Sequence, residues 1–358
     1  LSGRTDMHCY LLVSALLVVG APSDQANWPA FLGAGASPIA AESVPLQWSP
    51  EQNLAWQTEL PGDGQSSPVV WNGRVYITSV EGPMKDTIHL LAFDLASGRK
   101  LWGHSQASST KVKSTLYVSR AAPTPTADAD GVYAFFESGD LLATDHDGNI
   151  RWTRALTKDF GPFENKFCIG SSLAQTDDAI YVLADHEGPS YIMAIRKKDG
   201  SDIWKTERES RVSWSSPSLI EVDGVTQLVV SSSGSVDGYD PSNGKLLWSI
   251  ADVGGNTVTT PIAYDNGKFL VGASAGERGQ YAQIAPDSNL AAQIVMQDGS
   301  PSIQKLWKAE KALASFSSPI VHQGLAYWVN RVGVVFCFDA QTGEPKFDGR
   351  LEQSCWAT

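Results

Sequence analysis

The feature that most constrains this chain is a short pattern that recurs at intervals of roughly 40 to 60 residues along its 358-residue length. The first four copies have a small residue, an Asp or Arg two positions later, a Gly in the turn that follows, and a Trp on the next apolar segment. The copy that begins at Phe338 keeps Asp339, Gly343 and an aromatic residue, Phe347. The copies are Ala92–Trp102, Ala143–Trp152, Ala194–Trp204, Gly238–Trp248 and Phe338–Phe347, and a decayed copy keeps only Leu306-Trp307. Repeats of this length are typical of propellers and arrays, so the pattern must be explained before anything else.

A second motif precedes each copy and is rich in Ser, Thr and Pro. Its members are Ser66–Val69, Ala122–Pro125, Gly170–Leu173, Ser215–Pro217, Thr259–Pro261 and Ser317–Pro319. A turn and an apolar segment follow, as at Asn72-Gly73 and Asp130-Gly131, where Asn or Asp with Gly favours a tight hairpin. Each period therefore holds four strands, and the sequence predicts an all-β protein, a β-propeller of four-stranded blades.

The repeated tryptophans are predicted to be structural. They are Trp56, Trp102, Trp152, Trp204, Trp248 and Trp307. Each falls on the outermost strand of its period, where a large ring can cover the gap to the neighbouring blade, and the Gly before it permits a left-handed turn residue. The alternative, that these rings stack on a ligand, is less favoured.

The two ends of the repeat suggest how the ring closes. Residues 53–60 form a Trp strand with no blade of its own, and residues 352–358 resemble the opening of another blade. Sharing one blade between the chain ends would remove open sheet edges. We expect seven blades, with eight possible, a last blade that is C-terminally truncated in this sequence, a propeller over residues 53–358 and a loop segment over residues 22–52.

The N-terminus resembles a secretory signal. An apolar run over residues 11–20 follows Arg4 and ends at Val19-Gly20-Ala21, which has the small-residue spacing of a cleavage site. The run is too short to cross a bilayer as a helix. We expect residues 1–21 to be removed and the mature chain to be periplasmic or secreted, without a transmembrane segment; the alternative is a buried N-terminal strand or helix.

Charge excludes one class of partner. The net charge is −12 and the sequence pI is about 4.9, which argues against a nucleic-acid surface. The basic residues Lys111, Lys113 and 196–198 fall at expected turns and are interpreted as solvated. Cys168, Cys337 and Cys355 are widely and unequally spaced, so we expect buried thiols, with one disulfide left open as an alternative.

The copies of the first motif resemble the tryptophan-docking repeats of pyrroloquinoline-quinone-like propellers, over about residues 28–358. That family includes quinoprotein alcohol and glucose dehydrogenases, the outer-membrane assembly lipoprotein BamB and exported repeat proteins of unknown role. The leader Trp28-Pro29-x-Phe31-x-Gly33 is most similar to the last group. The resemblance implies the fold far more strongly than any activity.

The sequence departs from the quinoprotein dehydrogenases. The resemblance implies an adjacent Cys pair over the quinone, a Glu, Asn and Asp set around Ca²⁺ and a catalytic Asp; no two cysteines are adjacent here, and no such set can be placed. No catalytic residue and no cofactor is therefore predicted, and pyrroloquinoline quinone and calcium have no support. Asp128–Gly131 resembles a calcium loop only faintly and is interpreted as a hairpin turn.

Two segments depart most from the repeat, and they supply the candidate site. In 145–147 and 185–187 a His lies between carboxylates, which could raise its pKa, but both fall at turns and are interpreted as surface turns. Asp185, His186, Arg211 and Trp214 are the candidate residues of a binding mouth, because loops at that position usually carry function in propellers. No metal site is predicted.

The resulting functional hypothesis is a non-catalytic exported propeller that acts as a protein-interaction or scaffolding module, similar in role to BamB. Its partners would be other exported or envelope proteins, and the chain itself is expected to be a monomer. The alternative hypothesis is a quinone-dependent oxidoreductase.

Overall fold

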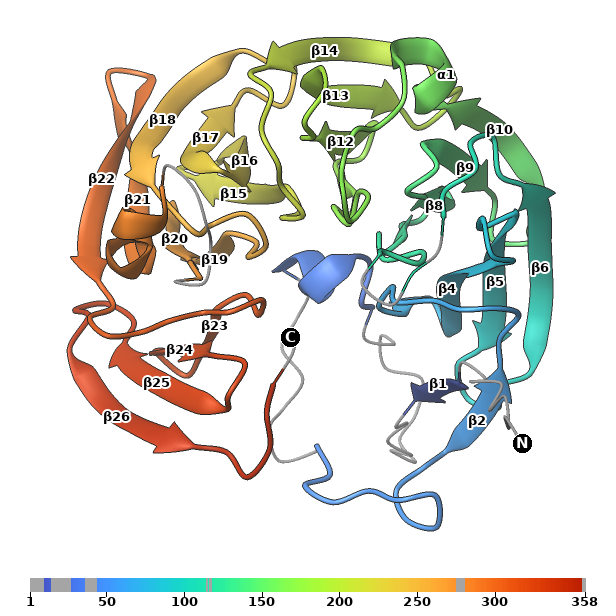
Figure 1. The fold of residues 1–358 in the computed structure, drawn as a ribbon, viewed down its shortest axis with the longest axis horizontal. Helices are drawn as coiled ribbons and strands as arrows, with labels where there is room; N and C mark the ends of the chain where they lie inside the picture. The colour runs from blue at the N-terminus through green and yellow to red at the C-terminus, as the bar shows by residue number, and fades with distance from the viewer. Residues whose placement is uncertain are drawn as a thin grey trace. The chain divides into compact units, whose positions relative to one another are not determined.

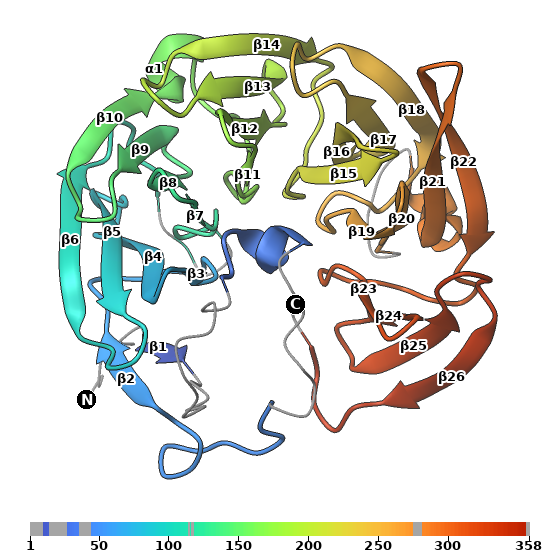
Figure 2. The ribbon, with the colours of Figure 1, turned by 180° about the vertical axis from the view of Figure 1, so that it is seen from behind.

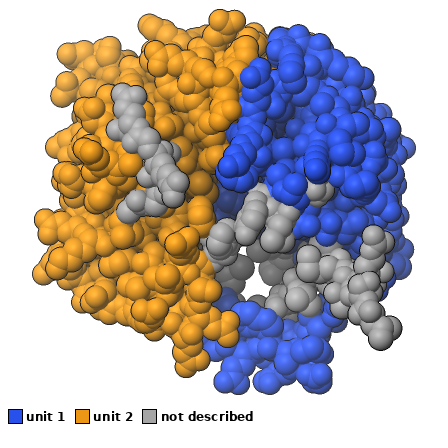
Figure 3. All heavy atoms as spheres, in the orientation of Figure 1, with its two compact units in different colours: residues 1–173, 197–200 blue, residues 174–196, 201–358 orange. Residues whose placement is uncertain are grey.

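The structure, a computed structural model, describes residues 10–13, 27–35, 44–113, 115, 118–274 and 281–355. It divides into two compact units, coloured in Figure 3: unit 1 holds residues 1–173 and 197–200, and unit 2 holds residues 174–196 and 201–358. The described residues form six four-stranded antiparallel sheets, each built from strands consecutive in the chain. The predicted class, an all-β propeller of four-stranded blades, is confirmed.

Unit 1 contains two of these sheets (Figure 1). The first comprises β3 (Val69–Trp71), β4 (Arg74–Glu81), β5 (Thr87–Asp94) and β6 (Lys100–Ala107). The second comprises β7 (Thr126–Ala127), β8 (Val132–Phe135), β9 (Asp140–Thr144) and β10 (Ile150–Ala155), followed by the short helix α1 (Leu156–Phe160). A 3₁₀ helix, η1 (Phe31–Gly35), lies in the leader segment.

Unit 2 contains four sheets, whose strands follow the same order. They are β11 (Ala174–Gln175), β12 (Ala179–Ala184), β13 (Ser190–Arg196) and β14 (Asp202–Arg208); β15 (Ser218–Val222), β16 (Val225–Ser232), β17 (Gly234–Tyr239) and β18 (Leu246–Val253); β19 (Ile262–Asp265), β20 (Lys268–Val271), β21 (Leu290–Gln297) and β22 (Ser300–Lys308); and β23 (Ile320–His322), β24 (Leu325–Val329), β25 (Val334–Asp339) and β26 (Pro345–Arg350). The 3₁₀ helix η3 (Ala282–Ser288) interrupts the third of these sheets between β20 and β21. Figure 2 gives the view from behind and labels the short first strands.

The Ala of the repeat has a packing role that its sequence position alone did not reveal. In each of the six four-stranded sheets the residue opposite the repeated aromatic is small, and the strand is bulged immediately beside that pair. The pairs are Ala92↔Trp102, Ala143↔Trp152, Ala194↔Trp204, Gly238↔Trp248, Ala291↔Trp307 and Cys337↔Phe347. A bulge re-aims the side chain that follows it, and a small partner leaves room for the indole ring.

The Gly of the repeat contacts the Trp of the preceding copy. A Cβ added to Gly98 would lie 2.4 Å from the ring of Trp56, and one added to Gly244 would lie 2.4 Å from the ring of Trp204. The same relation holds for Gly148 with Trp102, Gly200 with Trp152 and Gly343 with Trp307. These glycines also have positive φ, so two separate constraints exclude a side chain there.

Indole N–H groups continue this link. Trp56 Nε1 donates to the carbonyl of Leu95 at 2.9 Å, and Trp204 Nε1 donates to the carbonyl of Pro241 at 2.8 Å. Trp102 and Trp152 make the equivalent bonds to the carbonyls of His146 and Lys197. Trp248 instead donates to the Gln227 side chain at 2.6 Å.

The second motif forms an inner ladder of hydrogen bonds. In unit 1 the Ser67 N–H donates to the Thr124 hydroxyl, and the Thr124 N–H donates to the Ser172 hydroxyl, both at 3.0 Å. In unit 2 the Ser216 N–H donates to the Thr260 hydroxyl at 3.1 Å, and the Thr260 N–H donates to the Ser318 hydroxyl at 3.0 Å. The recurring hydroxyl therefore satisfies a buried backbone donor in the preceding copy.

Three parts of the repeat differ from its regular pattern. The decayed copy is a complete sheet, because Asp298-Gly299, both with positive φ, makes a tight turn in place of the longer repeat turn. Residues 352–355, at the expected opening of a further blade, form no strand, and residues 356–358 lie outside the described residues. Phe347, in the aromatic position of the last copy, is 53% exposed, whereas Trp56 is 9% exposed.

One strand lies within the predicted N-terminal signal segment. β1 (Tyr10–Val13) pairs antiparallel with β2 (Trp56–Glu59), so part of the apolar run is placed as a strand. Whether that strand is buried, as the alternative expected, stays a prediction. The rest of that run and its cleavage position lie outside the described residues. Cleavage of residues 1–21 stays a prediction. Among the described residues, no helix has the length and apolar character needed to span a bilayer.

Candidate functional site

The candidate site lies in unit 2, where the β12–β13 turn meets the segment that follows β14. Asp185 and His186 stand at the start of the turn, and Arg211 stands three residues after β14 ends. Asp185 is fully buried and His186 is 2% exposed, so the interpretation of this turn as a surface turn is wrong. The physical reason is that a buried cation, Arg208, takes up the Asp185 carboxylate.

Arg208 is the centre of an ionic network. Its Nε lies 2.8 Å from Asp185 Oδ1 and its Nη2 lies 3.1 Å from Asp185 Oδ2, which is a bidentate contact. Its Nη1 lies 3.2 Å from Asp237 Oδ2 and also donates to the Tyr239 hydroxyl. All three charged side chains are buried, so the network replaces hydration with fixed partners.

The pKa values show how the network is balanced. Burial by itself would lower the pKa of Arg208, but Asp185, Tyr239 and Asp237 hold it above its ordinary value. Burial raises the pKa of the Tyr239 hydroxyl, and Arg208 opposes that rise. Arg208 is therefore a permanent cation, and Tyr239 is a neutral hydroxyl that accepts from it at neutral pH.

Arg211 closes the network on its solvent side. Its Nη1 donates to Ser235 Oγ at 2.7 Å and lies 3.7 Å from Asp237 Oδ2. Asp237 also accepts from the hydroxyls of Ser235 at 2.8 Å and Ser249 at 2.6 Å. The charges facing this site are thus paired with one another.

His186 is joined to the same region through Ser190. The Ser190 hydroxyl lies 3.0 Å from the His186 N–H and 2.8 Å from the His186 carbonyl, and it accepts from the Arg211 N–H at 3.4 Å. His186 Nδ1 accepts from the Gly188 N–H at 3.1 Å. The structure therefore brings Asp185, His186 and Arg211 together.

Trp214 belongs to a different contact. Its backbone N–H donates to the Thr257 carbonyl at 2.7 Å, and its side chain is half-buried. Whether these four residues bind a ligand stays a prediction, since the contacts described are all within the protein.

Sequence reasoning missed Arg208, Asp237 and Tyr239. A signal was available for Asp237, because superposing the repeat copies places it at the position of Leu91, Leu142 and Met193. A carboxylate where every other copy has an apolar residue indicates a buried partner.

The remaining candidate motifs are occupied by structural contacts. Asp128 Oδ1 accepts from the N–H groups of Asp130 and Gly131, as a hairpin turn requires, while its Oδ2 pairs with Lys197. Lys197 is 3% exposed, so its interpretation as a solvated turn residue is wrong. His146 bonds the Tyr76 hydroxyl and the Asp128 carbonyl, each at 2.7 Å.

The side chains that could bind a metal ion are those of His, Cys, Asp and Glu. In the part of the chain that the structure describes, no three His, Cys, Asp or Glu residues are grouped as a metal site would need. Cys337 is buried and Cys168 and Cys355 are half-buried, and all three are thiols.

Comparison with known proteins now adds the family. The family model described as outer membrane protein assembly factor BamB matches residues 48–165 and 162–348. The chain belongs to this family. A search of curated proteins finds no match for the BamB-family chain.

Solved structures support the fold of this BamB-family protein. A europium-containing methanol dehydrogenase has a TM-score of 0.57 at 14% identity, covering 85% of this chain and 73% of that one. BamB from Moraxella catarrhalis has a TM-score of 0.51 at 12% identity, covering 82% of this chain and 77% of that one. At such identities the likeness concerns the fold alone.

Proposed function

We propose that this chain is an exported, non-catalytic propeller that acts as an interaction or scaffolding module for other exported or envelope proteins. The observation that carries the proposal is the closed network around Arg208, in which buried cations and carboxylates are paired with one another. Such a network gives a rigid polar platform, because its charged groups are held by one another. Membership of the BamB family, whose description is that of an assembly factor, supports the same role.

A platform of this kind recognises a partner through fixed polar groups and an aromatic side chain. Trp214 is half-buried, and aromatic and Arg side chains are the usual anchors of protein interfaces. Arg211, which is 18% exposed, lies three residues away in the chain. We therefore assign Trp214 and Arg211 as the contact residues of the module.

Site-specific photo-crosslinking tests this assignment. A photoreactive residue at position 214 of the exported full chain should give one discrete crosslinked envelope protein, and the matched control at the exposed position 347 should not. Arg211→Ala should weaken capture of that same partner. Equal capture from both positions would contradict the assignment.

The oxidoreductase alternative has its own readout. Purified protein mixed with pyrroloquinoline quinone and Ca²⁺ should show no new cofactor absorbance and no dye reduction with alcohols or sugars. A bound quinone with turnover would replace the scaffolding proposal.

Export is tested at the N-terminus. We propose that residues 1–21 are removed, so the protein recovered from the periplasm or medium should begin at Pro22. A recovered chain that retains Tyr10–Val13 would contradict cleavage and would leave those residues to pair with β2.

A further inference from the structure

A second buried ionic group lies in unit 1, away from the candidate site and unrelated to the proposed function. Lys85 and Glu137 are each 1% exposed, and Lys85 Nζ lies 2.8 Å from Glu137 Oε1. Lys85 also donates to the Ser119 carbonyl, and its Nζ lies 3.9 Å from the sulfur of Cys168. We name Lys85, Glu137, Ser119, Ala121 and Cys168 the Lys85 clasp.

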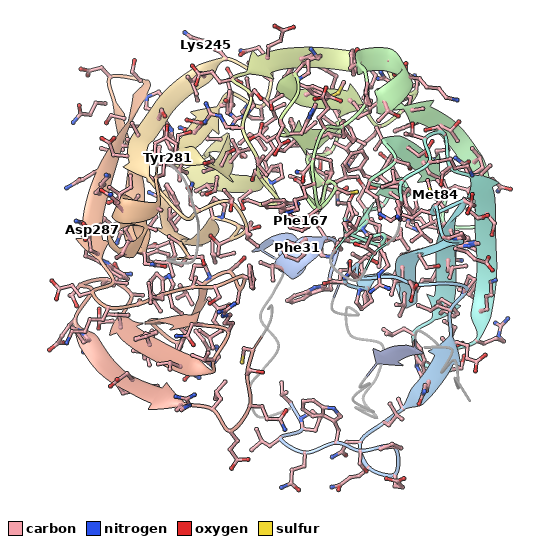
Figure 4. The ribbon with its side chains drawn as sticks, viewed as in Figure 1. Phe31, Met84, Phe167, Lys245, Tyr281 and Asp287 are labelled. Atoms are coloured by element: carbon pink, nitrogen blue, oxygen red, sulfur yellow. The ribbon has the colours of Figure 1, made fainter. Side chains whose placement is uncertain are left out.

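The clasp ties together four connecting segments of unit 1. Lys85 lies in the β4–β5 turn, Ser119 and Ala121 precede β7, Glu137 lies in the β8–β9 turn, and Cys168 follows α1. Both carboxylate oxygens of Glu137 accept from the Ala121 N–H, at 3.0 and 3.1 Å. Figure 4 labels Met84 and Phe167, which precede Lys85 and Cys168 in the chain.

Three residues of the Lys85 clasp have a strained backbone. Lys85, Ala121 and Cys168 have φ values of 48°, 46° and 63°, in the left-handed region that residues with a side chain rarely adopt. Strained residues persist only where the surroundings hold them, and they concentrate at functional positions. Three such residues lie beside one buried amine and one thiol, so a functional role is expected for that pair.

We propose that Lys85 and Cys168 are a site of oxidative modification, at which dioxygen joins the amine nitrogen to the thiol sulfur through one bridging oxygen atom. Cysteine oxidation products commonly condense with a neighbouring nucleophile, and lysine reaches such positions on its flexible stem. A separation of 3.9 Å between nitrogen and sulfur suits a bond path through oxygen better than a direct nitrogen–sulfur bond.

The reaction balances with the groups present and dioxygen. One N–O and one S–O bond form, and the O–O bond, one N–H bond and the S–H bond break. The sulfur and nitrogen together give up four electrons, which dioxygen accepts; its second oxygen atom leaves as water with the two hydrogen atoms. The remaining extra proton of the Lys85 ammonium passes to the Glu137 carboxylate.

Glu137 is placed to take that proton. Burial raises the pKa of the Glu137 carboxyl, and Lys85 opposes the rise, so loss of the lysine charge favours the protonated acid. The product therefore holds a neutral bridge beside a neutral carboxyl, and no unpaired charge is left buried. Burial also raises the pKa of the Cys168 thiol, so it reacts slowly with dissolved electrophiles while its amine neighbour stays in contact.

Peptide mapping of the intact full chain tests the proposal. Protein kept in air and protein kept without oxygen are digested with trypsin under non-reducing conditions. Only the aerobic sample should yield peptides joined between Lys85 and Cys168, heavier than their sum by one oxygen atom less two hydrogen atoms. Trypsin should fail to cleave after the modified Lys85, and dithiothreitol should restore cleavage.

Variants separate the bridge from general oxidation. Cys168→Ser leaves the Lys85–Glu137 pair intact and should abolish the joined peptide, as should Lys85→Arg, which keeps the cation. Cys337→Ser is the matched control, because it removes a different thiol and should leave the joined peptide unchanged. Cys168 recovered as an unmodified thiol, as a sulfinic acid, or joined without the oxygen atom would overturn the proposal, and this result does not depend on folding of the Lys85 variant.

Discussion

The Lys85 clasp of unit 1 and the Arg208 network of unit 2 are both buried ionic clusters, and they are built differently. The Lys85 clasp has one cation and one carboxylate, with the remaining contacts made to backbone groups and to the sulfur of Cys168. The Arg208 network has two cations that share Asp237, with Asp185 bound to Arg208 from a second strand end. The clasp is therefore a single pair, whereas the network is a chain of pairs.

The difference determines what happens when one member is lost. A lone buried pair can be neutralised by one proton transfer, because its carboxyl has no other charged partner to satisfy. A shared network cannot, since removing its central cation leaves two carboxylates with incomplete partners. We infer that the clasp is suited to a chemical change and the network to rigidity.

Replacing Arg208, the centre of the network, should have the largest effect on the free energy of unfolding. Arg208→Met leaves Asp185 and Asp237 buried without their main cation, and the free energy of unfolding should fall by about 3–5 kcal/mol. Urea unfolding measures the loss, and hydrogen exchange should locate it in β12 to β17. Lys205→Met is the control on the same strand: its ion partner Glu207 is 88% exposed, so the change should cost about 1 kcal/mol or less. Similar losses for both variants would contradict the network.

Removing the Lys85 cation from the clasp should lower the free energy of unfolding less at acidic than at neutral pH. In Lys85→Met the Glu137 carboxyl loses the cation that opposed its raised pKa, so the pKa rises further. A raised folded-state pKa gives stability that is present below the unfolded value of about 4.5 and is lost as pH rises through the folded value. The loss relative to wild type should be about 3 kcal/mol near pH 7 and should shrink toward pH 4.5. A loss independent of pH in urea unfolding would show that Glu137 does not titrate.

Double replacement sharpens the comparison. Lys85→Met with Glu137→Leu removes the whole pair, so most of the single-variant loss should return, to within about 1 kcal/mol of wild type. Arg208→Met with Asp185→Leu should recover much less, because Asp237 keeps only Arg211 as a cation. A double-mutant cycle in urea measures both, and equal recovery would mean that the two clusters are equivalent.

The repeat was readable because its constraints are local. The small residue, the Gly and the Trp act through one hairpin and its neighbour, so the repeat pattern predicted four-stranded sheets of the observed kind. Ala291 was missed because the turn after it, Asp298-Gly299, is shorter than the others, and the pattern is visible only once Ala291 is seen opposite Trp307. In this copy a shorter turn replaces the sequence motif, while the packing of the Trp opposite a small residue is kept.

The candidate site was less readable, because its contacts join residues far apart in the chain. The pattern around Asp185 and His186 is that of an exposed turn, and only the cation of Arg208 makes burial of Asp185 favourable. Nothing near Lys85 marks it as buried, since its partner Glu137 lies far along the chain, in the β8–β9 turn. Charge pairs of this kind have no periodicity, so a sequence pattern cannot indicate them.

The smallest expected effect on stability separates the edge of the network from its centre. Arg211→Gln removes a cation that is 18% exposed and lies 3.7 Å from Asp237, while Arg208 and the hydroxyls of Ser235 and Ser249 remain on that carboxylate. Solvent screening limits such a pair, so urea unfolding should show a loss of about 1 kcal/mol or less. Because Gln keeps a donor for Ser235, the turn geometry should persist in hydrogen exchange. A loss as large as that of Arg208→Met would mean that Arg211, and not Arg208, holds Asp237, and the ordering of centre and edge would have to be reversed.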